Sequence, residues 1–190
     1  MTARAFAANR RLAEQLELEA THDALTQLPN RRFFLDWMNR SIAMASRNKF
    51  SVALYFIDLD GFKQVNDRYG HDAGDEVLRV AAKRFLGLKR ESDLLVRLGG
   101  DEFAILVAQA PDNEQLSSFA ARIIAALDAP ISIGDETAKV GASIGIAVFP
   151  RDAGSEDALI GAADQAMYQA KQTGKNRCCF FRPADVPVGS

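Results

Sequence analysis

Two adjacent carboxylates, Asp101 and Glu102, lie where the chain is predicted to make a tight turn. The pair Gly99-Gly100 separates two apolar runs of strand length, Leu94–Val96 and Phe103–Val107. Glycine reaches the positive-φ conformations that tight hairpin turns need, so this pattern favours a β-hairpin. The hairpin does not need the two acids, which repel each other unless a cation lies between them. The turn is therefore a candidate metal platform, and the alternative is an exposed hairpin tip whose acids keep it soluble.

A second acidic segment follows a predicted buried strand. Phe50–Ile57 is continuous, apolar and rich in aromatic and β-branched residues, and it stops at Asp58-Leu59-Asp60-Gly61. Phe62-Lys63 then opens a short helix. Carboxylates bind hard cations, and the free N–H groups at a helix start bind phosphate. If this strand and the hairpin are neighbours, the two acidic segments favour Mg²⁺; the alternative is a simple Asp cap and turn.

Three polar side chains in the next stretch could converge on a ligand. Asn66, His71 and Asp75 lie around a loop that is predicted between two helices. A carboxylate can accept two parallel hydrogen bonds from the N1–H and N2–H₂ groups of guanine, which adenine cannot offer. The stretch is a candidate guanine pocket, although His71 alone fits equally well as a loop-packing residue.

Two further pairs of charged residues have spacings that suit an anion or a base. Arg90 and Asp93, just before the hairpin, could present a donor fork and an acceptor on one surface, which suits a guanine base and a phosphate. The alternative is an exposed ion pair of little energetic weight. Lys171 and Lys175 are one helical turn apart near a predicted helix end. They could reach a terminal phosphate or simply complement the helix dipole.

The remaining elements must position these side chains. Apolar periodicity and turn residues predict the following helices: one capped by Asn30 and running to about Arg47, one starting near Asp72 or Gly74, Asn113–Leu127 and Ser155–Thr173. The further strands predicted are Ile131–Ile133, Lys139–Phe149 and Arg177–Phe181, the first two paired around the turn at Gly134-Asp135.

Composition limits the classes of protein to consider. The 190 residues are 48% hydrophobic and 25% charged, which is typical of one globular domain with a core of its own. The net charge of −2 argues against binding to a nucleic acid polymer. No apolar run approaches the ~20 residues of a membrane span. The two cysteines, Cys178 and Cys179, are adjacent and provide no disulfide framework, so a cytoplasmic setting is expected.

The chain ends are predicted to stand apart from this domain. Residues 4–22 form a moderately amphipathic helix, too short for a confident coiled coil, which is either a stalk from an upstream segment or a helix docked on the domain. We expect a stalk or signalling helix at residues 1–22, the domain at 23–182 and a C-terminal tail at 183–190. On the stalk interpretation an upstream sensor precedes the chain, and this domain is the cytoplasmic part of a larger, even membrane-bound, protein.

Taken together, these motifs resemble the GGDEF family of diguanylate cyclases. The resemblance covers about Asp23 to Arg182 and rests on six motifs in order: DxLTxLxNRR at Asp23 to Arg32, DxDxFKxxND at Asp58 to Asp67, GHxxGD at Gly70 to Asp75, RxxD at Arg90 to Asp93, GGDEF at Gly99 to Phe103 and ADxAxYxAKxxGxN at Ala163 to Asn176. It implies an α+β fold, an α/β sandwich whose central, mostly antiparallel sheet is flanked by helices, as in nucleotide cyclases and the polymerase palm. It also implies condensation of two GTP to cyclic di-GMP and two pyrophosphates, with one GTP per subunit of a homodimer.

The resemblance implies a role for each motif residue. Two ions of Mg²⁺, or Mn²⁺, would be held by Asp58, the Leu59 carbonyl, Asp101 and Glu102. Asp101 would also be the general base toward the 3′-hydroxyl, and Lys63 would stabilise charge on the phosphates. The residues implied to bind the nucleotide are Gly61, Phe62, Lys63, Asn66, His71, Asp75, Gly99, Gly100, Lys171 and Lys175. The RxxD residues Arg90 and Asp93 match the family's inhibitory product site, so feedback inhibition by cyclic di-GMP is expected.

Small departures and two rival functions stay open at this point. Gln27 replaces a common glycine, Lys175 stands where arginine is frequent, and Asp101 is the shorter of the two acids that this position takes in the family. The main rival is a catalytically silent domain that senses GTP or cyclic di-GMP. Another is a cyclase that makes a cyclic mononucleotide. The presence of the four residues Asp58, Asp101, Glu102 and Lys63 favours an active enzyme over a silent domain.

Overall fold

A five-stranded sheet carries the acidic segments at one of its ends. The computed structural model describes residue 10 and residues 15–183. Its helices are α2 (Arg31–Asn48), α3 (Phe62–Tyr69), α4 (His71–Leu86), α5 (Asn113–Ala125) and α6 (Glu156–Gln172). Its strands are β1 (Val52–Asp60), β2 (Leu94–Gly99), β3 (Glu102–Ala108), β4 (Ile131–Ile133), β5 (Glu136–Ala138), β6 (Gly141–Phe149) and β7 (Arg177–Phe180).

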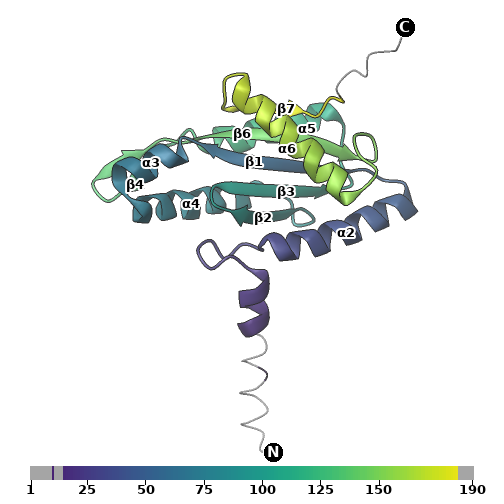
Figure 1. The fold of residues 1–190 in the computed structure, drawn as a ribbon, viewed down its shortest axis with the longest axis horizontal. Coiled ribbons are helices and arrows are strands. Elements are labelled where there is room, and N and C mark those ends of the chain that lie inside the picture. The colour runs from purple at the N-terminus through teal and green to yellow at the C-terminus, as the bar shows by residue number, and fades with distance from the viewer. Residues whose placement is uncertain (1–9, 11–14, 184–190) are drawn as a thin grey trace, which may run out of the picture.

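The sheet has the strand order β2-β3-β1-β6-β7 (Figure 1). The central strand β1 pairs antiparallel with β3 and β6, and only the edge strand β7 runs parallel to its neighbour. The predicted α+β fold with a mostly antiparallel sheet is confirmed. Residues 52–59 of β1 are all buried, as the continuous apolar run predicts for a strand covered on both faces.

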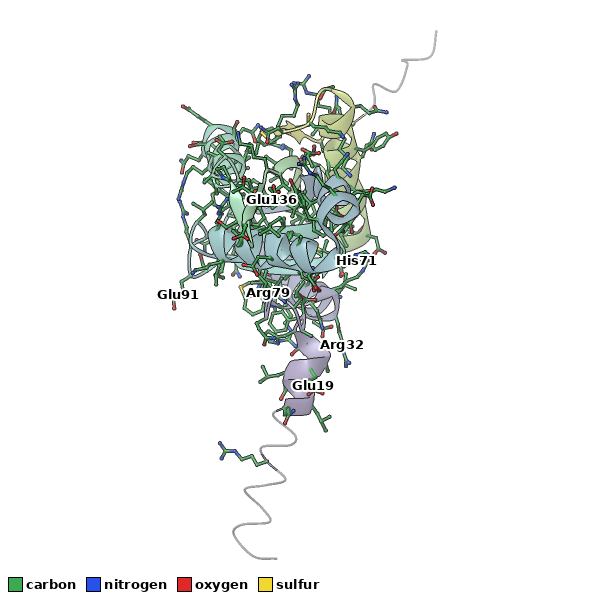
Figure 2. All side chains as sticks on the ribbon, turned by 90° about the vertical axis from the view of Figure 1, so that its left-hand side faces the viewer. Glu19, Arg32, His71, Arg79, Glu91 and Glu136 are labelled. Atoms are coloured by element: carbon green, nitrogen blue, oxygen red, sulfur yellow. The ribbon has the colours of Figure 1, made fainter. Side chains whose placement is uncertain are left out.

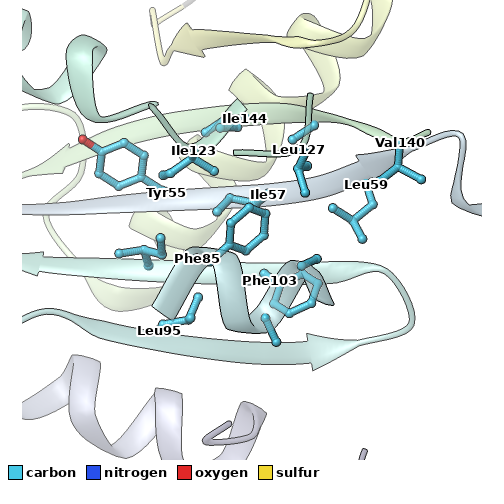
Figure 3. Packing of buried hydrophobic residues seen from close by; sticks show 14 of the residues in the cluster. Tyr55, Ile57, Leu59, Phe85, Leu95, Phe103, Ile123, Leu127, Val140 and Ile144 are labelled. Carbon is cyan, nitrogen blue, oxygen red and sulfur yellow. The ribbon is translucent and has the colours of Figure 1, made fainter. Parts of the chain in front are cut away.

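Two apolar clusters cover the two faces of the sheet. On one face Tyr55, Ile57 and Leu59 of β1 pack with α4 and α5 (Figure 3). Within this cluster Phe85 of α4 meets Phe103 of β3 edge to face, with ring centroids 5.5 Å apart. On the other face α2 and α6 cover the alternate residues of β1. Because side chains alternate along a strand, Asp58 points to the α2/α6 face.

The start of helix α4 is predicted in part. Helix α4 begins at His71, directly after Gly70 at φ +86°, so the expected start near Asp72 is confirmed to within one residue and the alternative near Gly74 is wrong. Gly74 is buried inside α4, and a Cβ there would overlap the side-chain oxygen of Asn66. The capping of α2 by Asn30 is confirmed, since the Asn30 side chain accepts a 3.1 Å hydrogen bond from the Phe33 amide.

The pairing predicted around Gly134-Asp135 is also wrong. Strand β4 pairs with the short strand β5, with Ile133 opposite Glu136, and these two strands form a separate hairpin. A two-residue turn brings the immediately following residues back onto β4, so Lys139–Phe149 cannot be its partner. The long apolar strand β6 instead joins β1, with Val52 opposite Phe149.

The predicted terminal segments lie partly outside the described residues. Residues 15–21 are helical, while residues 1–9 and 11–14 of the expected stalk helix and residues 184–190 of the tail lie outside. Figure 2 shows Glu19 on a helix that projects from the body of the domain. No helix in the described part of the chain is long and apolar enough to cross a membrane.

Gly145 of β6 sets how closely α6 packs on the sheet. A Cβ at this position would overlap the backbone of α6 at Ala163 and Met167, which cannot yield as a side chain can. We expect Gly145→Ala to lower the free energy of unfolding by about 3 kcal/mol, the upper end of ordinary overpacking penalties. Chemical denaturation measures this value.

Gly161 on the exposed side of α6 provides the matched control. Nothing lies within 4 Å of a Cβ built there. Because glycine is a poor helix former, Gly161→Ala should raise stability by about 0.5–1 kcal/mol. Equal stability of the two variants would contradict this account of how α6 packs.

Candidate functional site

The two acidic segments meet in the sheet. In the ladder between β1 and β3, Asp58 lies directly opposite Glu102. The Leu59 amide donates a 3.2 Å hydrogen bond to the carbonyl of Asp101, so the hairpin turn is bonded to the end of β1. Like charges directly opposite each other in a sheet are destabilising. Folding therefore forces together carboxylates that would separate if they were free.

This placement raises the pKa values of the carboxyl groups of Asp58 and Glu102. Asp58 is only 8% exposed, and burial raises its pKa, although the Lys171 ammonium, 2.7 Å from its Oδ2, opposes the rise. Asp101 raises the pKa of Asp58 further. Burial is also the largest cause of the raised pKa of Glu102, followed by the charges of Asp58 and Asp101. The cluster holds more negative charge than Lys171 neutralises.

The donor set suits Mg²⁺ in the way that nucleotide enzymes hold it. No three His, Cys, Asp or Glu side chains within the described residues converge into a metal cage. Magnesium, however, is commonly held by one or two carboxylates together with substrate phosphates. Asp58, Asp101 and Glu102 could supply hard oxygen ligands for that arrangement, and their surplus negative charge would favour a divalent cation.

An open groove lies beside the acids and is lined by residues that can hold phosphates. Asp58 and Asp101 share this groove with Gly61, Phe62, Lys63, Lys171 and Lys175. Gly61 precedes α3 at φ +86°, a conformation that glycine adopts without strain, and the first amides of α3 follow it. The structure thus gathers the five predicted phosphate-binding residues at one place. Gly99 and Gly100 lie at the adjoining turn, with φ of +139° and +52°.

Asp60 is a residue of this region whose contacts the sequence did not reveal. Its carboxylate accepts 2.9 Å hydrogen bonds from the Ser143 hydroxyl and from the Asn176 amide. The Asn176 amide directly follows Lys175, and both residues have left-handed backbone conformations. Asp60 therefore ties the loop that presents Lys175 to the end of β1. The partners are 116 positions apart, so no local pattern could have shown this contact.

The predicted guanine-binding residues lie on the adjacent pair of helices. Asn66 is on α3, while His71 and Asp75 begin α4, and these two helices pack against each other. His71 is exposed and Asp75 is half-buried, so the interpretation of His71 as a packing residue loses support. Asn66 has a buried side-chain oxygen with no hydrogen-bond partner in the described part of the chain. A buried polar atom without a partner is costly unless a ligand satisfies it.

Arg90 and Asp93 line a separate cavity at the start of β2. Tyr55, Phe119 and Arg122 are among the other residues that line it. Asp93 is 6% exposed and accepts a 3.0 Å hydrogen bond from the Arg90 backbone amide, while its Oδ1 has no partner among the described residues. The alternative of an exposed surface ion pair therefore does not describe Asp93. The cavity offers guanidinium donors, a buried acceptor and aromatic rings.

Comparison with known proteins gives the family. A family model described as diguanylate cyclase, GGDEF domain, matches residues 20–177. The chain is 46% identical over 158 residues to diguanylate cyclase TpbB of Pseudomonas aeruginosa. The matched residues cover 83% of this chain and 36% of TpbB. The chain thus spans about a third of the length of this relative.

Two solved structures share the fold. The structure of only the GGDEF domain of TpbB superposes with a TM-score of 0.82 at 44% identity, covering 85% of this chain and 94% of that one. The coiled coil and GGDEF domain of DgcB from Caulobacter crescentus, in complex with c-di-GMP, superposes with a TM-score of 0.84 at 28% identity, covering 94% of this chain and 96% of that one. With the family model matching most of its residues, the chain belongs to the GGDEF-domain family of diguanylate cyclases.

Proposed function

We propose that the chain condenses two molecules of GTP into cyclic di-GMP with release of two pyrophosphates, and that it needs Mg²⁺ or Mn²⁺. The observation that carries the proposal is the placement of Asp58 directly opposite Glu102, with Asp101 on the adjoining turn and three lysines beside them. Such a placement raises the energy of the metal-free protein and suits a triphosphate bound with divalent ions.

Each side chain has a part in this reaction. Asp58, the Leu59 carbonyl, Asp101 and Glu102 would hold two metal ions, which neutralise the phosphates and polarise the α-phosphate when bound. Asp101 takes the proton of the 3′-hydroxyl while the oxygen of that hydroxyl attacks the α-phosphorus. The bond between the α-phosphorus and the oxygen of the leaving pyrophosphate then breaks. The lysines of the groove (Lys63, Lys171 and Lys175) balance the charge of the departing pyrophosphate.

Catalysis requires two copies of the domain in this proposal. One groove holds one GTP, so the 3′-hydroxyl that attacks each α-phosphorus comes from the nucleotide of the opposing subunit. Residues 1–22 would act as a stalk that brings two domains together under the control of an upstream sensor. The solved DgcB neighbour, which includes a coiled coil with its GGDEF domain, supports this role for the segment before Asp23.

The cavity at Arg90 and Asp93 is proposed to bind the product and inhibit the enzyme. Two guanidinium groups and a buried carboxylate suit the phosphates and guanine edges of cyclic di-GMP. The DgcB neighbour was solved in complex with this dinucleotide. The cavity is distinct from the groove at Asp58, so inhibition would act at a distance from the reacting atoms.

The rival function is a silent domain that binds GTP or cyclic di-GMP without turnover. Incubation with GTP and Mg²⁺, followed by chromatography, distinguishes the two functions, since only an active enzyme forms the cyclic dinucleotide. A cyclase of another type would give a cyclic mononucleotide in the same chromatogram.

Asp75→Ala tests the proposed guanine pocket. The variant loses the acceptor for the guanine N1–H and N2–H₂ groups, so we expect kcat/KM for GTP to fall by about 10–100-fold, in line with the loss of hydrogen bonds to a charged group. Competition by ATP should become correspondingly stronger. The exposed Asp72→Ala on the same helix is the control and should keep the selectivity of the unaltered protein. Unchanged preference for GTP over ATP in Asp75→Ala would contradict the assignment.

A further inference from the structure

The loop after α6 holds Lys175 in a backbone conformation that is unfavourable for a residue with a side chain. Gly174, Lys175 and Asn176 have φ of +123°, +59° and +46° in succession. Because left-handed conformations crowd the Cβ atom, this segment needs contacts that hold it. The Lys175 amide donates a 3.0 Å hydrogen bond to the carbonyl of Ala170, and the Lys175 carbonyl accepts one of 3.2 Å from Nε of Arg177. Both bonds are local, so they do not attach the loop to the body of the sheet.

Asp60, the last residue of β1, makes that attachment. Its Oδ2 accepts a 2.9 Å hydrogen bond from the Asn176 amide, which belongs to the peptide directly after Lys175. The hydroxyl of Ser143 on β6 lies 2.9 Å from each of the two Asp60 oxygens and orients the carboxylate. Ser143 is fully buried, so this donor is not shared with solvent. One carboxylate thus transmits the position of the sheet to the backbone of Lys175.

The Asn176 side chain lies against the start of β6. A Cβ built on Gly141, which is opposite Asp60 in the ladder, would come within 2.6 Å of the Asn176 side-chain oxygen. The same oxygen accepts a 3.4 Å hydrogen bond from the Ala142 amide. The glycine therefore lets the loop approach the sheet closely, and Asp60 holds the backbone of the loop in that place.

The position of the loop matters because Lys175 lines the groove beside Asp58. Lys171 lines the same groove, but its ammonium is already paired with Asp58 at 2.7 Å. The Lys175 ammonium has no ion pair or hydrogen bond within the described residues. It is therefore available to a bound anion, and because a lysine side chain is long and flexible, its place in the groove depends on its backbone.

We propose that Asp60 is a positioning residue for phosphate binding, which acts by holding the Lys175 loop against the sheet. The inference rests on the proposed function, in which the groove binds the phosphates of GTP. An acid beside this groove repels a phosphate by its charge. Through its hydrogen bonds Asp60 nevertheless strengthens phosphate binding, a role different from the one proposed for Asp58 two positions earlier.

Isothermal titration with pyrophosphate in the presence of Mg²⁺ tests this role in Asp60→Ala and Asp60→Asn. Both variants remove the same negative charge, which by electrostatics alone should tighten the binding of an anion in both. Asp60→Ala also removes both acceptors, so we expect the affinity for pyrophosphate to fall by about 10-fold. Asparagine can still accept from the Asn176 amide and donate to the Ser143 hydroxyl, so Asp60→Asn should stay within about 3-fold of the unaltered protein.

A double-variant cycle with Lys175→Met tests whether Asp60 acts through this lysine. Lys175→Met keeps the length of the side chain, removes its charge and should lower the affinity for pyrophosphate by about 10–100-fold. If Asp60 positions Lys175, adding Asp60→Ala to Lys175→Met should cause no further loss. Losses that multiply in the double variant would overturn the proposal. Affinity in folded Asp60→Ala equal to or tighter than that of the unaltered protein would overturn it as well.

The controls separate positioning from damage to the fold and from the proposed reaction. Asp135→Ala removes an exposed carboxylate on the β4–β5 turn and should leave pyrophosphate affinity unchanged, and circular dichroism at the titration temperature establishes that each variant is folded. An unaltered protein that binds pyrophosphate and makes no cyclic di-GMP would refute the proposed reaction, while a weakened Asp60→Ala would still support the positioning role. An unaltered protein without measurable affinity for pyrophosphate would overturn the positioning role.

Discussion

Asp58→Asn is expected to lower the rate of cyclic di-GMP formation by at least about 10³-fold, because metal ions supply several kcal/mol of transition-state stabilisation and each ~1.4 kcal/mol is a factor of ten. The same change should raise the thermal unfolding midpoint of the protein in EDTA. Burial and the charge of Asp101 raise the pKa of Asp58, so the fold favours the neutral form, which asparagine imitates.

The pH dependence of stability follows from the same shifts. The pKa values of Asp58 and Glu102 are raised in the folded protein, so the folded state binds protons more tightly than the unfolded state. The associated stability is fully present below their ordinary values of 3.8 and 4.5 and is lost as pH rises through the raised values. These two groups therefore withdraw stability from the metal-free protein over that range, and the stability of Asp58→Asn relative to the unaltered protein should rise with pH. Unfolding midpoints measured across this pH range in EDTA check the sign.

The control for this variant is Asp135→Asn, an exposed carboxylate on the β4–β5 turn. It should leave activity unchanged and alter the free energy of unfolding by no more than about 0.5 kcal/mol. Retained activity in Asp58→Asn, or a lower unfolding midpoint in EDTA, would contradict the account of the acid cluster.

Arg90→Ala is expected to raise the inhibition constant of cyclic di-GMP by about 10–100-fold, since a hydrogen bond to a charged group is worth about 1.5–3 kcal/mol. Initial rates at low product should stay unchanged, because the cavity at Arg90 is separate from the groove at Asp58. Arg122→Ala, at another residue that lines the same cavity, should weaken inhibition as well. Initial rates at increasing concentrations of added product give these constants.

Direct binding provides the second measurement of the inhibitory site. Isothermal titration of cyclic di-GMP in EDTA should show one class of sites that weakens in Arg90→Ala and persists in Arg79→Ala, an exposed arginine on α4. Product inhibition that is equal in Arg90→Ala and the unaltered protein would exclude this cavity as the inhibitory site.

Local patterns were enough to predict the elements that carry the site. The continuous apolar run before Asp58 and the glycine pair before Asp101 each specify a strand end or a turn without reference to distant residues. The left-handed conformation of Gln27, φ +59°, explains why glycine is common at that position. The backbone strain of a non-glycine residue at this position could not be seen in the sequence alone.

Contacts between distant segments could not be predicted in this way. Asp60 bonds the Asn176 amide, and Arg97 bonds Asp23, and neither pair has a characteristic spacing. Asp164 of α6 is a further example, because its charge helps to raise the pKa of Glu102 only after α6 has packed on the sheet. The wrong partner predicted for β4 is not such a case, because the two-residue turn at Gly134-Asp135 returns the short segment Glu136–Ala138 to β4, and the prediction chose the longer apolar run that follows it.

The most direct test of the central claim is product formation as a function of protein concentration. The protein is incubated with GTP and Mg²⁺, and products are separated by chromatography. We predict one cyclic di-GMP for every two pyrophosphates, with a rate that grows more than linearly with protein concentration because the active form contains two subunits. The absence of cyclic di-GMP from a sample shown to be dimeric by light scattering would contradict the claim.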